Sequence, residues 1–102
     1  ESNFSQVSPP VFDGESYDLW AAKMETYLEA LDLWEVVEED YEVLPLPNNP
    51  TMAQIKSHKE RKARKAKAKA WLFAGVSKTI FTRIIALKLA KAIWDYLKEE
   101  YA

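Results

Sequence analysis

Few residues of this chain are of the types that perform catalysis. The sequence has no cysteine and a single histidine, His58, which excludes disulfides, thiolate metal sites and a thiol nucleophile. His58 stands among lysines and arginines, which disfavour a bound cation, and we expect it to face solvent. The acidic residues Glu38, Glu39, Asp40 and Glu42 lack the ligand spacing of a calcium loop. We therefore expect no enzymatic activity, no cofactor and no metal site.

The charged residues are segregated along the chain, although the net charge is only -2. Eleven acidic residues and one basic residue lie in segment 13–42, whereas segment 56–69 has eight basic residues and one acidic residue. A basic run of this kind is usually a solvated helix face. It could also neutralise RNA phosphates, in which case the contacting residues would be Lys56, Arg61, Arg64, Lys67 and Lys69. A third alternative is a contact between copies, which would pair basic Lys59, Lys62 and Lys65 with acidic Glu25, Glu29 and Asp32.

The first half of the chain shows one amphipathic helix and one short apolar cluster. Apolar residues recur at steps of three and four over residues 17–31, which predicts a helix, and Ser16 is its expected N-cap. Residues 33–37 are densely apolar and predict a short second helix. Three prolines between residues 38 and 50 predict a loop there.

Three further helices are predicted in the second half. Thr51 and Gln54 have the spacing of a capping box, and the Ala-, Lys- and Arg-rich residues that follow favour a long helix over 51–74. We expect its buried stripe to comprise Met52, Ile55, Ala63, Ala66, Ala70, Phe73 and Ala74, with Trp71 and Leu72 widening it. Gly75 ends this helix and Ser77 caps a short one, whose apolar face comprises Ile80, Phe81, Ile84 and Ile85. The last helix is expected over 88–101, with Leu89, Ile93, Trp94, Tyr96 and Leu97 buried.

The predicted fold is therefore all-α, a compact bundle of four to five helices. We expect residues 1–12 to form an extended leader, because Pro9 and Pro10 resist helix, and residues 13–102 to form a single domain. Val11 and Phe12 are expected to pin the leader onto that domain. No apolar run is long enough to span a bilayer, so we expect no membrane partner. The chain starts without Met, as a fragment of a longer protein would.

Three sequence elements, in order, resemble the Gag polypeptide of copia-type LTR retrotransposons. Residues 10–20, PVFDGESYDLW, followed by Met-Glu-Thr-Tyr-Leu at 24–28, are similar to the opening of that family. Leu-Trp-Glu-Val-Val at 33–37 matches its next element. Residues 90–97, AKAIWDYL, followed by Tyr101, resemble its later element. The resemblance covers roughly residues 9 to 101.

This resemblance implies a retroviral-capsid-like domain, the N-terminal lobe of a Gag capsid. Such lobes associate into shells that enclose RNA, so the implied partners are other copies of the chain and, in the full-length protein, RNA. The implied location is cytoplasmic virus-like particles. The chain shows neither the second lobe nor the Cys/His knuckle of a full Gag, so we expect an isolated lobe that is monomeric or weakly associated. It would come from a retrotransposon or from a host gene derived from one.

The sequence is also compatible with two other functions. An adaptor could bind a partner peptide in a hydrophobic groove between the first and last helices. Its contacts would include Val11 and Phe12, which also count among the candidates for a protein interface. Trp34 is a further candidate, since tryptophan is enriched at interaction hot spots. The remaining alternative is RNA binding through the basic run 56–69, without the aromatic platform that single-strand binders favour.

Overall fold

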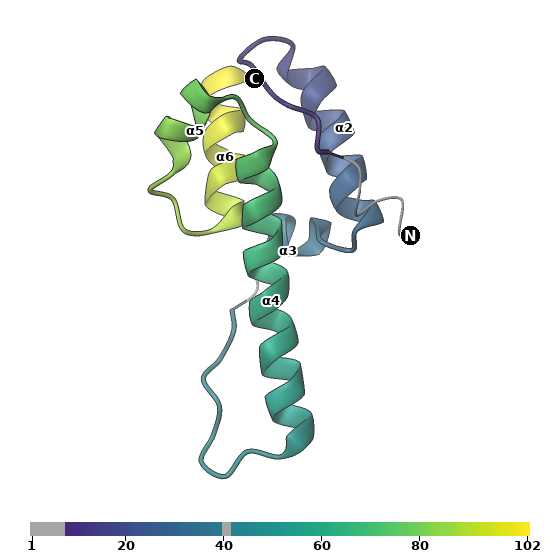
Figure 1. The fold of residues 1–102 in the computed structure, drawn as a ribbon, viewed down its shortest axis with the longest axis vertical. Helices are drawn as coiled ribbons and strands as arrows, with labels where there is room; N and C mark the ends of the chain where they lie inside the picture. Colours follow the sequence, from purple (N-terminus) through teal and green to yellow (C-terminus); the bar gives the residue numbers. More distant parts are fainter. Residues whose placement is uncertain (1–7, 40–41) are drawn as a thin grey trace.

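The computed structural model describes residues 8–39 and 42–102. In these residues it has five helices: α2 (Tyr17–Ala30), α3 (Trp34–Glu39), α4 (Met52–Ala74), α5 (Lys78–Ile84) and α6 (Ala90–Tyr101). The predicted all-α bundle is confirmed. Helices α3 and α4 pack on α6, and α3 also contacts α2 and α4. The first half of α4 and the loop before it project from the bundle (Figure 1), so the molecule measures 50 × 30 × 20 Å.

We call residues 42–62, which comprise this loop and the first half of α4, the arm, and the rest of the described chain the body. Figure 1 shows the arm at one end of the long axis, with the first turn of α2 and the end of α6 at the other. None of residues 42–67 is buried. The hydrophobic core therefore lies entirely in the body.

The core is formed by apolar side chains from every helix and from the segment before α2. Because α2 repeats Trp20, Met24 and Leu28 at steps of four, one of its faces is buried. No charged or polar residue is buried in the residues described. The buried hydrophobic residues are Phe12, Trp20, Met24, Leu28, Leu33, Val36, Val37, Ala68, Leu72, Val76, Ile80, Ile84, Ala90, Ile93 and Leu97.

Helix α2 begins where the sequence predicts, but Ser16 does not cap it with its side chain. Its backbone is left-handed (φ 56°, ψ 50°), and its hydroxyl makes no capping hydrogen bond. A side-chain N-cap needs an extended backbone, which Ser16 does not have. The Ser16 carbonyl still accepts from the N–H groups of Leu19 and Trp20, so only the capping part of the prediction is wrong.

Helix α4 confirms the predicted capping box and overturns the predicted buried stripe. The Thr51 hydroxyl accepts from the Gln54 N–H (3.1 Å), and the Gln54 side chain accepts from the Thr51 N–H (2.8 Å). The helix buries only Ala68 and Leu72. Met52 is 82% exposed. Exposure is also found at Ala63, Ala66, Ala70 and Ala74, while Ile55, Phe73 and Trp71 are half-buried.

The prediction that a stripe along the whole of α4 is buried was wrong for a physical reason. Helical spacing selects a face but does not show how much of a helix has a neighbour, and the body reaches only the second half of α4. The burial predicted for the two helices after α4 is partly wrong for the same reason. Ile85 and Leu89 flank the turn after α5 and are 56% and 42% exposed. Ile84, Ile93 and Leu97 are buried as expected, and Phe81, Trp94 and Tyr96 are half-buried.

The junction between α4 and α5 confirms both predicted signals and is closely packed. Gly75 caps α4, and the Ser77 hydroxyl accepts from the Ile80 N–H at 3.4 Å. A Cβ added at Gly75 would meet the terminal methyl of buried Met24 and would lie 3.2 Å from the Pro10 carbonyl oxygen. Glycine is therefore required here for close approach.

Candidate interaction surfaces

The segment before α2 is built into the body by its backbone as well as by Phe12. The Phe12 N–H donates to the Gly75 carbonyl (2.9 Å), and the Ser77 N–H donates to the Phe12 carbonyl (2.9 Å). The Trp20 indole N–H lies within hydrogen-bond distance of two carbonyls, those of Pro10 (3.0 Å) and Gly75 (3.1 Å). These bonds hold an extended peptide against the α4–α5 junction.

Phe12 is a core residue and not a surface contact. Its side chain is 1% exposed and lies against the rings of Tyr17, Trp20 and Tyr101, with centroids 4.9 to 5.8 Å apart. The sequence expectation that Phe12 belongs to an interface is therefore corrected: its aromatic neighbours from α2 and α6 enclose it. Val11, its neighbour, is 61% exposed and stays available to a partner. Phe12 also fills the place between the first and last helices where a peptide groove was predicted.

Trp34 is half-buried because it packs inside the molecule. Its ring meets the Trp94 ring edge-on, with centroids 5.1 Å apart, and Trp94 in turn stacks on Trp20 at 5.5 Å. The three indoles link α3, α6 and α2. The ring contact of Trp34 with Trp94 thus lies within the body.

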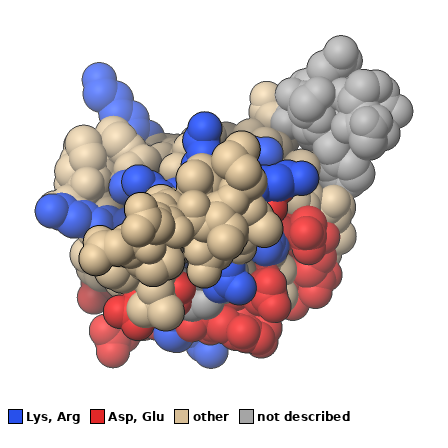
Figure 2. Space-filling view, turned by 90° about the horizontal axis from the view of Figure 1, so that it is seen from below, with Lys and Arg blue, Asp and Glu red and all other residues tan. Residues whose placement is uncertain are grey.

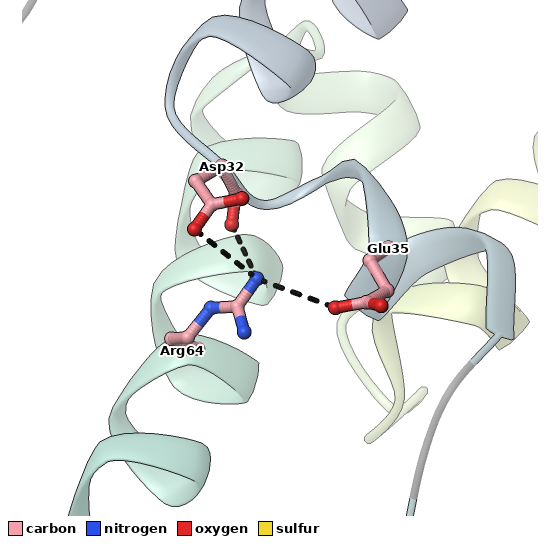
Figure 3. A network of polar contacts seen from close by, with 3 residues as sticks. All are labelled: Asp32, Glu35 and Arg64. Carbon is pink, nitrogen blue, oxygen red and sulfur yellow. Dashed lines mark hydrogen bonds and ion pairs between the residues drawn. The ribbon is translucent and has the colours of Figure 1, made fainter.

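Arg64 joins α4 to the turn between α2 and α3 (Figure 3). Its guanidinium Nη2 donates to the Asp32 carbonyl oxygen and lies 3.8 Å from the carboxylates of both Asp32 and Glu35. The Asp32 side chain is 94% exposed, so the ion pairs are solvent-screened and contribute little. Arg64 was predicted to contact RNA, but the structure directs it into the molecule, where it fastens the base of the arm.

Asp32 ends helix α2 in a left-handed conformation (φ 61°). Its N–H donates to the Glu29 carbonyl (3.0 Å), and the Leu33 N–H donates to the Leu28 carbonyl (2.7 Å). This is the Schellman pattern, in which aspartate takes the position usually occupied by glycine. Of the three acidic contacts predicted from the sequence, Asp32 thus has a structural use, whereas Glu29 is exposed and Glu25 half-buried on α2.

The basic residues of α4 are presented mainly to solvent. Lys56, Lys59, Arg61, Lys62 and Lys67 are exposed. Lys65 and Lys69 are half-buried, and the Lys69 Nζ lies 6.0 Å from the centre of the Phe73 ring. Seen from the arm end, acidic side chains gather along one edge of the molecule, and many of the basic ones lie away from that edge (Figure 2). The segregation in sequence is thus a segregation of surfaces.

Sequence reasoning missed an exposed apolar surface at the tip of the arm. Met52, Leu44 and Leu46 are 82%, 69% and 39% exposed. Residues 43–55 contain no charged side chain. The available signal was this uncharged stretch beside a basic run. Its prolines indicate only a loop, however, and the spacing of Met52 and Ile55 indicates a buried stripe. Inside the arm, a hollow of about 320 Å³ separates the loop from α4, and the His58 Nδ1–H donates to the Leu44 carbonyl (3.1 Å).

Among the residues that the structure describes, two shallow hollows on the surface of the body bear on binding. One, of about 540 Å³, lies between the end of α4 and α5 and is lined by Ala70, Phe73, Ala74, Val76, Lys78 and Phe81. The other, of about 380 Å³, lies at the end opposite the arm and is lined by Ser16, Tyr17, Asp18, Leu19, Tyr101 and Ala102. We call the second one the end hollow.

The end hollow has a carboxylate side at Tyr17, whereas on its other side the Arg83 guanidinium donates to the Tyr101 hydroxyl (3.0 Å). Burial raises the pKa of the Tyr17 phenol, and the charges of Asp18 and Asp95 raise it further. A negative field opposes formation of the phenolate. The same field would attract a cationic or electropositive surface.

Residues 8–39 and 42–102 contain no cluster of three or more His, Cys, Asp or Glu side chains that could hold a metal ion. Asp40, part of the acidic group considered above, lies outside these residues. Among the helices described, none combines the length and apolar character that a bilayer crossing needs.

Residues 24–102 match the family described as the gag-polypeptide of LTR copia-type. The chain belongs to this family. The match covers more than half of the chain and includes the second and third of the elements that carried the resemblance; residues 10–20 precede it. No curated protein and no solved structure gives a significant match. Membership in the Gag family agrees with a structural role.

Proposed function

We propose that this Gag domain is the N-terminal lobe of a capsid and acts by self-association into shells that enclose RNA, as cytoplasmic virus-like particles. Family membership supports a structural Gag role. The observation that carries self-association is the separation of charge between two exposed surfaces. One is the basic face of α4; the other is the acidic face of α2.

Opposite surfaces on identical copies favour a heterologous contact. A patch that complements a different patch on the next copy generates rings or open arrays, as a shell requires. Lys59 and Lys62 on α4 are exposed, and Glu29 on α2 is exposed on the acidic side. Electrostatic complementarity would orient the copies and speed their encounter. Weak contacts of this kind become strong when many are linked in one lattice.

Light scattering after size exclusion tests this proposal over a wide range of protein and salt concentrations. We expect the mass to rise with protein concentration and to fall with added salt, because exposed charges are screened. The double variant Lys59→Glu/Lys62→Glu should lower the mass. The control Lys78→Glu/Lys88→Glu makes the same charge change at exposed sites outside α4. Its measured mass should stay above that of the Lys59→Glu/Lys62→Glu variant. A strict monomer at every concentration would contradict self-association through this lobe.

RNA contact is a second candidate, favoured by the exposed cations Lys56, Arg61 and Lys67 along α4. Binding through phosphates predicts affinity for single-stranded RNA that falls steeply with salt. Fluorescence anisotropy with labelled RNA measures this slope. Replacing Lys56 and Lys67 with Gln should make the salt dependence of the affinity shallower, by the equivalent of about two phosphate contacts. An unchanged slope would show that these two residues do not contact RNA.

We do not propose the adaptor function. A peptide bound between α2 and α6 would have to displace Phe12, which is 1% exposed. Removing an aromatic side chain from a core costs about 3–5 kcal/mol, more than a short peptide readily offsets.

A further inference from the structure

The arm tip has the surface of a docking element. Its apolar side chains Leu44 and Met52 are 69% and 82% exposed. Around them, residues 43–55 carry no charge, although 29% of the whole chain is charged. Seen from the arm end, the nearest part of the molecule is a surface without charged side chains (Figure 2). Apolar surface gathered at the far end of a projection is typical of a contact site.

Basic residues follow the tip along the helix. Lys56 is one turn beyond Met52, and Lys59 and Lys62 lie on the turns after it. All three are exposed. A partner surface that covers the tip therefore needs an apolar hollow with acidic surroundings.

The end hollow has both properties on its Tyr17–Asp18 side, away from the contact of Arg83 with Tyr101. Leu19 in its lining is 69% exposed, beside the rings of Tyr17 and Tyr101 and the carboxylate of Asp18. The exposed acids Glu15 and Asp95 lie on the elements that form it. The first turn of α2 and the end of α6, which supply the lining of this hollow, lie at the end of the long axis opposite the arm (Figure 1).

Two alternative contacts for the arm tip are less favourable. If the arms of two copies paired with each other, their basic runs would be juxtaposed and would repel. The hollow between α4 and α5 is apolar, but its lining includes Lys78, and the Lys69 Nζ lies 6.0 Å from the centre of its Phe73 ring; these cations would meet those of an incoming arm. Charge complementarity thus selects the end hollow of another copy.

We propose that the arm tip of one copy docks, head to tail, in the end hollow of the next, with Met52 and Leu44 against Leu19 and with Lys56 near Asp18. This contact rests on the proposed self-association, but its acidic partner is Asp18 in the first turn of α2 and not Glu29 in the last turn of that helix. Because tip and hollow lie at opposite ends of the molecule, the contact leaves one of each free and propagates.

Two single variants block the two sides of this contact without disturbing the fold. Met52→Asp places a carboxylate at the first helical position of α4, where the helix dipole favours it, and sets it against the acidic hollow. Leu19→Lys changes an exposed residue of the hollow. Each variant should raise the self-association dissociation constant at least about tenfold, as loss of a central contact does. Ile85→Lys is the matched control: its side chain is 56% exposed on the body, away from the end hollow, and its association should equal that of the wild type.

Mixing the two variants identifies a head-to-tail contact by sedimentation velocity. Met52→Asp copies retain an intact hollow and Leu19→Lys copies retain an intact tip, so an equimolar mixture should form heterodimers, and nothing larger, at concentrations where each variant alone is monomeric. A mixture that stays monomeric overturns the proposal. If Met52→Asp alone associates as strongly as the wild type, the head-to-tail contact is also overturned. Self-association would then occur through other surfaces. A wild-type chain that never associates would overturn both.

Discussion

Helix α4 belongs to two regions that are stabilised in different ways. Its last turns lie in the body, where Ala68 and Leu72 are fully buried. Its first turns lie in the arm, where none of the side chains is buried. The body is stabilised by removing apolar surface from water. The arm depends on local helix-forming interactions: a sequence rich in Lys, Arg, Gln and Glu, a capping box and the His58–Leu44 hydrogen bond. This difference predicts how each region responds to substitution.

The largest effect is expected from Phe12→Ala. The side chain is 1% exposed within an aromatic cluster, so we expect unfolding to become easier by about 3–5 kcal/mol. In a domain of this size that lowers Tm by at least about 12 °C. Val11→Ala, at the exposed neighbour, should change stability by less than about 0.5 kcal/mol. Thermal denaturation followed by circular dichroism measures both, and equal effects would mean that the leader is not part of the body.

Gly75→Ala should be the next largest effect. The new Cβ meets the methyl of Met24, which is 0% exposed and has little room to move. Overpacking of this kind costs about 1–3 kcal/mol. The double variant Gly75→Ala/Met24→Ala frees space for the Cβ, so urea unfolding should show that the two changes are less than additive. Strict additivity would show that the two side chains do not meet.

Thr51→Ala acts on the arm. Loss of the capping hydroxyl should destabilise the first turns of α4 by about 1 kcal/mol. Because these turns are not covered by the body, amide hydrogen exchange near Ile55 should accelerate about fivefold, with little change in Tm. Thr51→Ser retains the capping oxygen and is the control. A large fall in Tm would show that the arm and the body unfold together.

Met52→Ala should have the smallest effect, below about 0.5 kcal/mol. The same change at Met24 in the body should cost about 2–5 kcal/mol. The two methionines differ in environment alone: one is 82% exposed and the other 0%. Urea unfolding of both variants compares the two regions directly, and similar losses would contradict the division into body and arm.

Local signals predicted most of the secondary structure. The Thr51–Gln54 capping box, Gly75 and Ser77 set helix boundaries that the structure confirms. They were predictable because a cap is formed by residues a few positions apart, whose hydrogen bonds depend only on the local side chains and backbone. Ser16 was the exception. Its backbone is left-handed, a conformation that capping preferences do not predict.

The candidate surfaces were less predictable. Arg64 was grouped with the RNA-binding cations and Asp32 with the contacts between copies, yet the structure joins these two residues across 32 positions. The exposed tip was missed because a periodic apolar residue such as Met52 is normally assumed to face a core. Which residues are exposed depends on where the neighbouring helices end, and no local pattern encodes that distance.

The sequence by itself determined that the chain is helical, roughly where its helices lie, that it is a copia-type Gag domain, and that its charge is segregated. These properties follow from interactions between residues close in sequence, or from motifs read in order. Only the tertiary structure decided which half of α4 is buried, that Phe12 is a core residue, and that the apolar tip and the end hollow lie at opposite ends. These depend on the packing of distant segments, where burial of apolar surface selects one arrangement among many that the same helices could adopt.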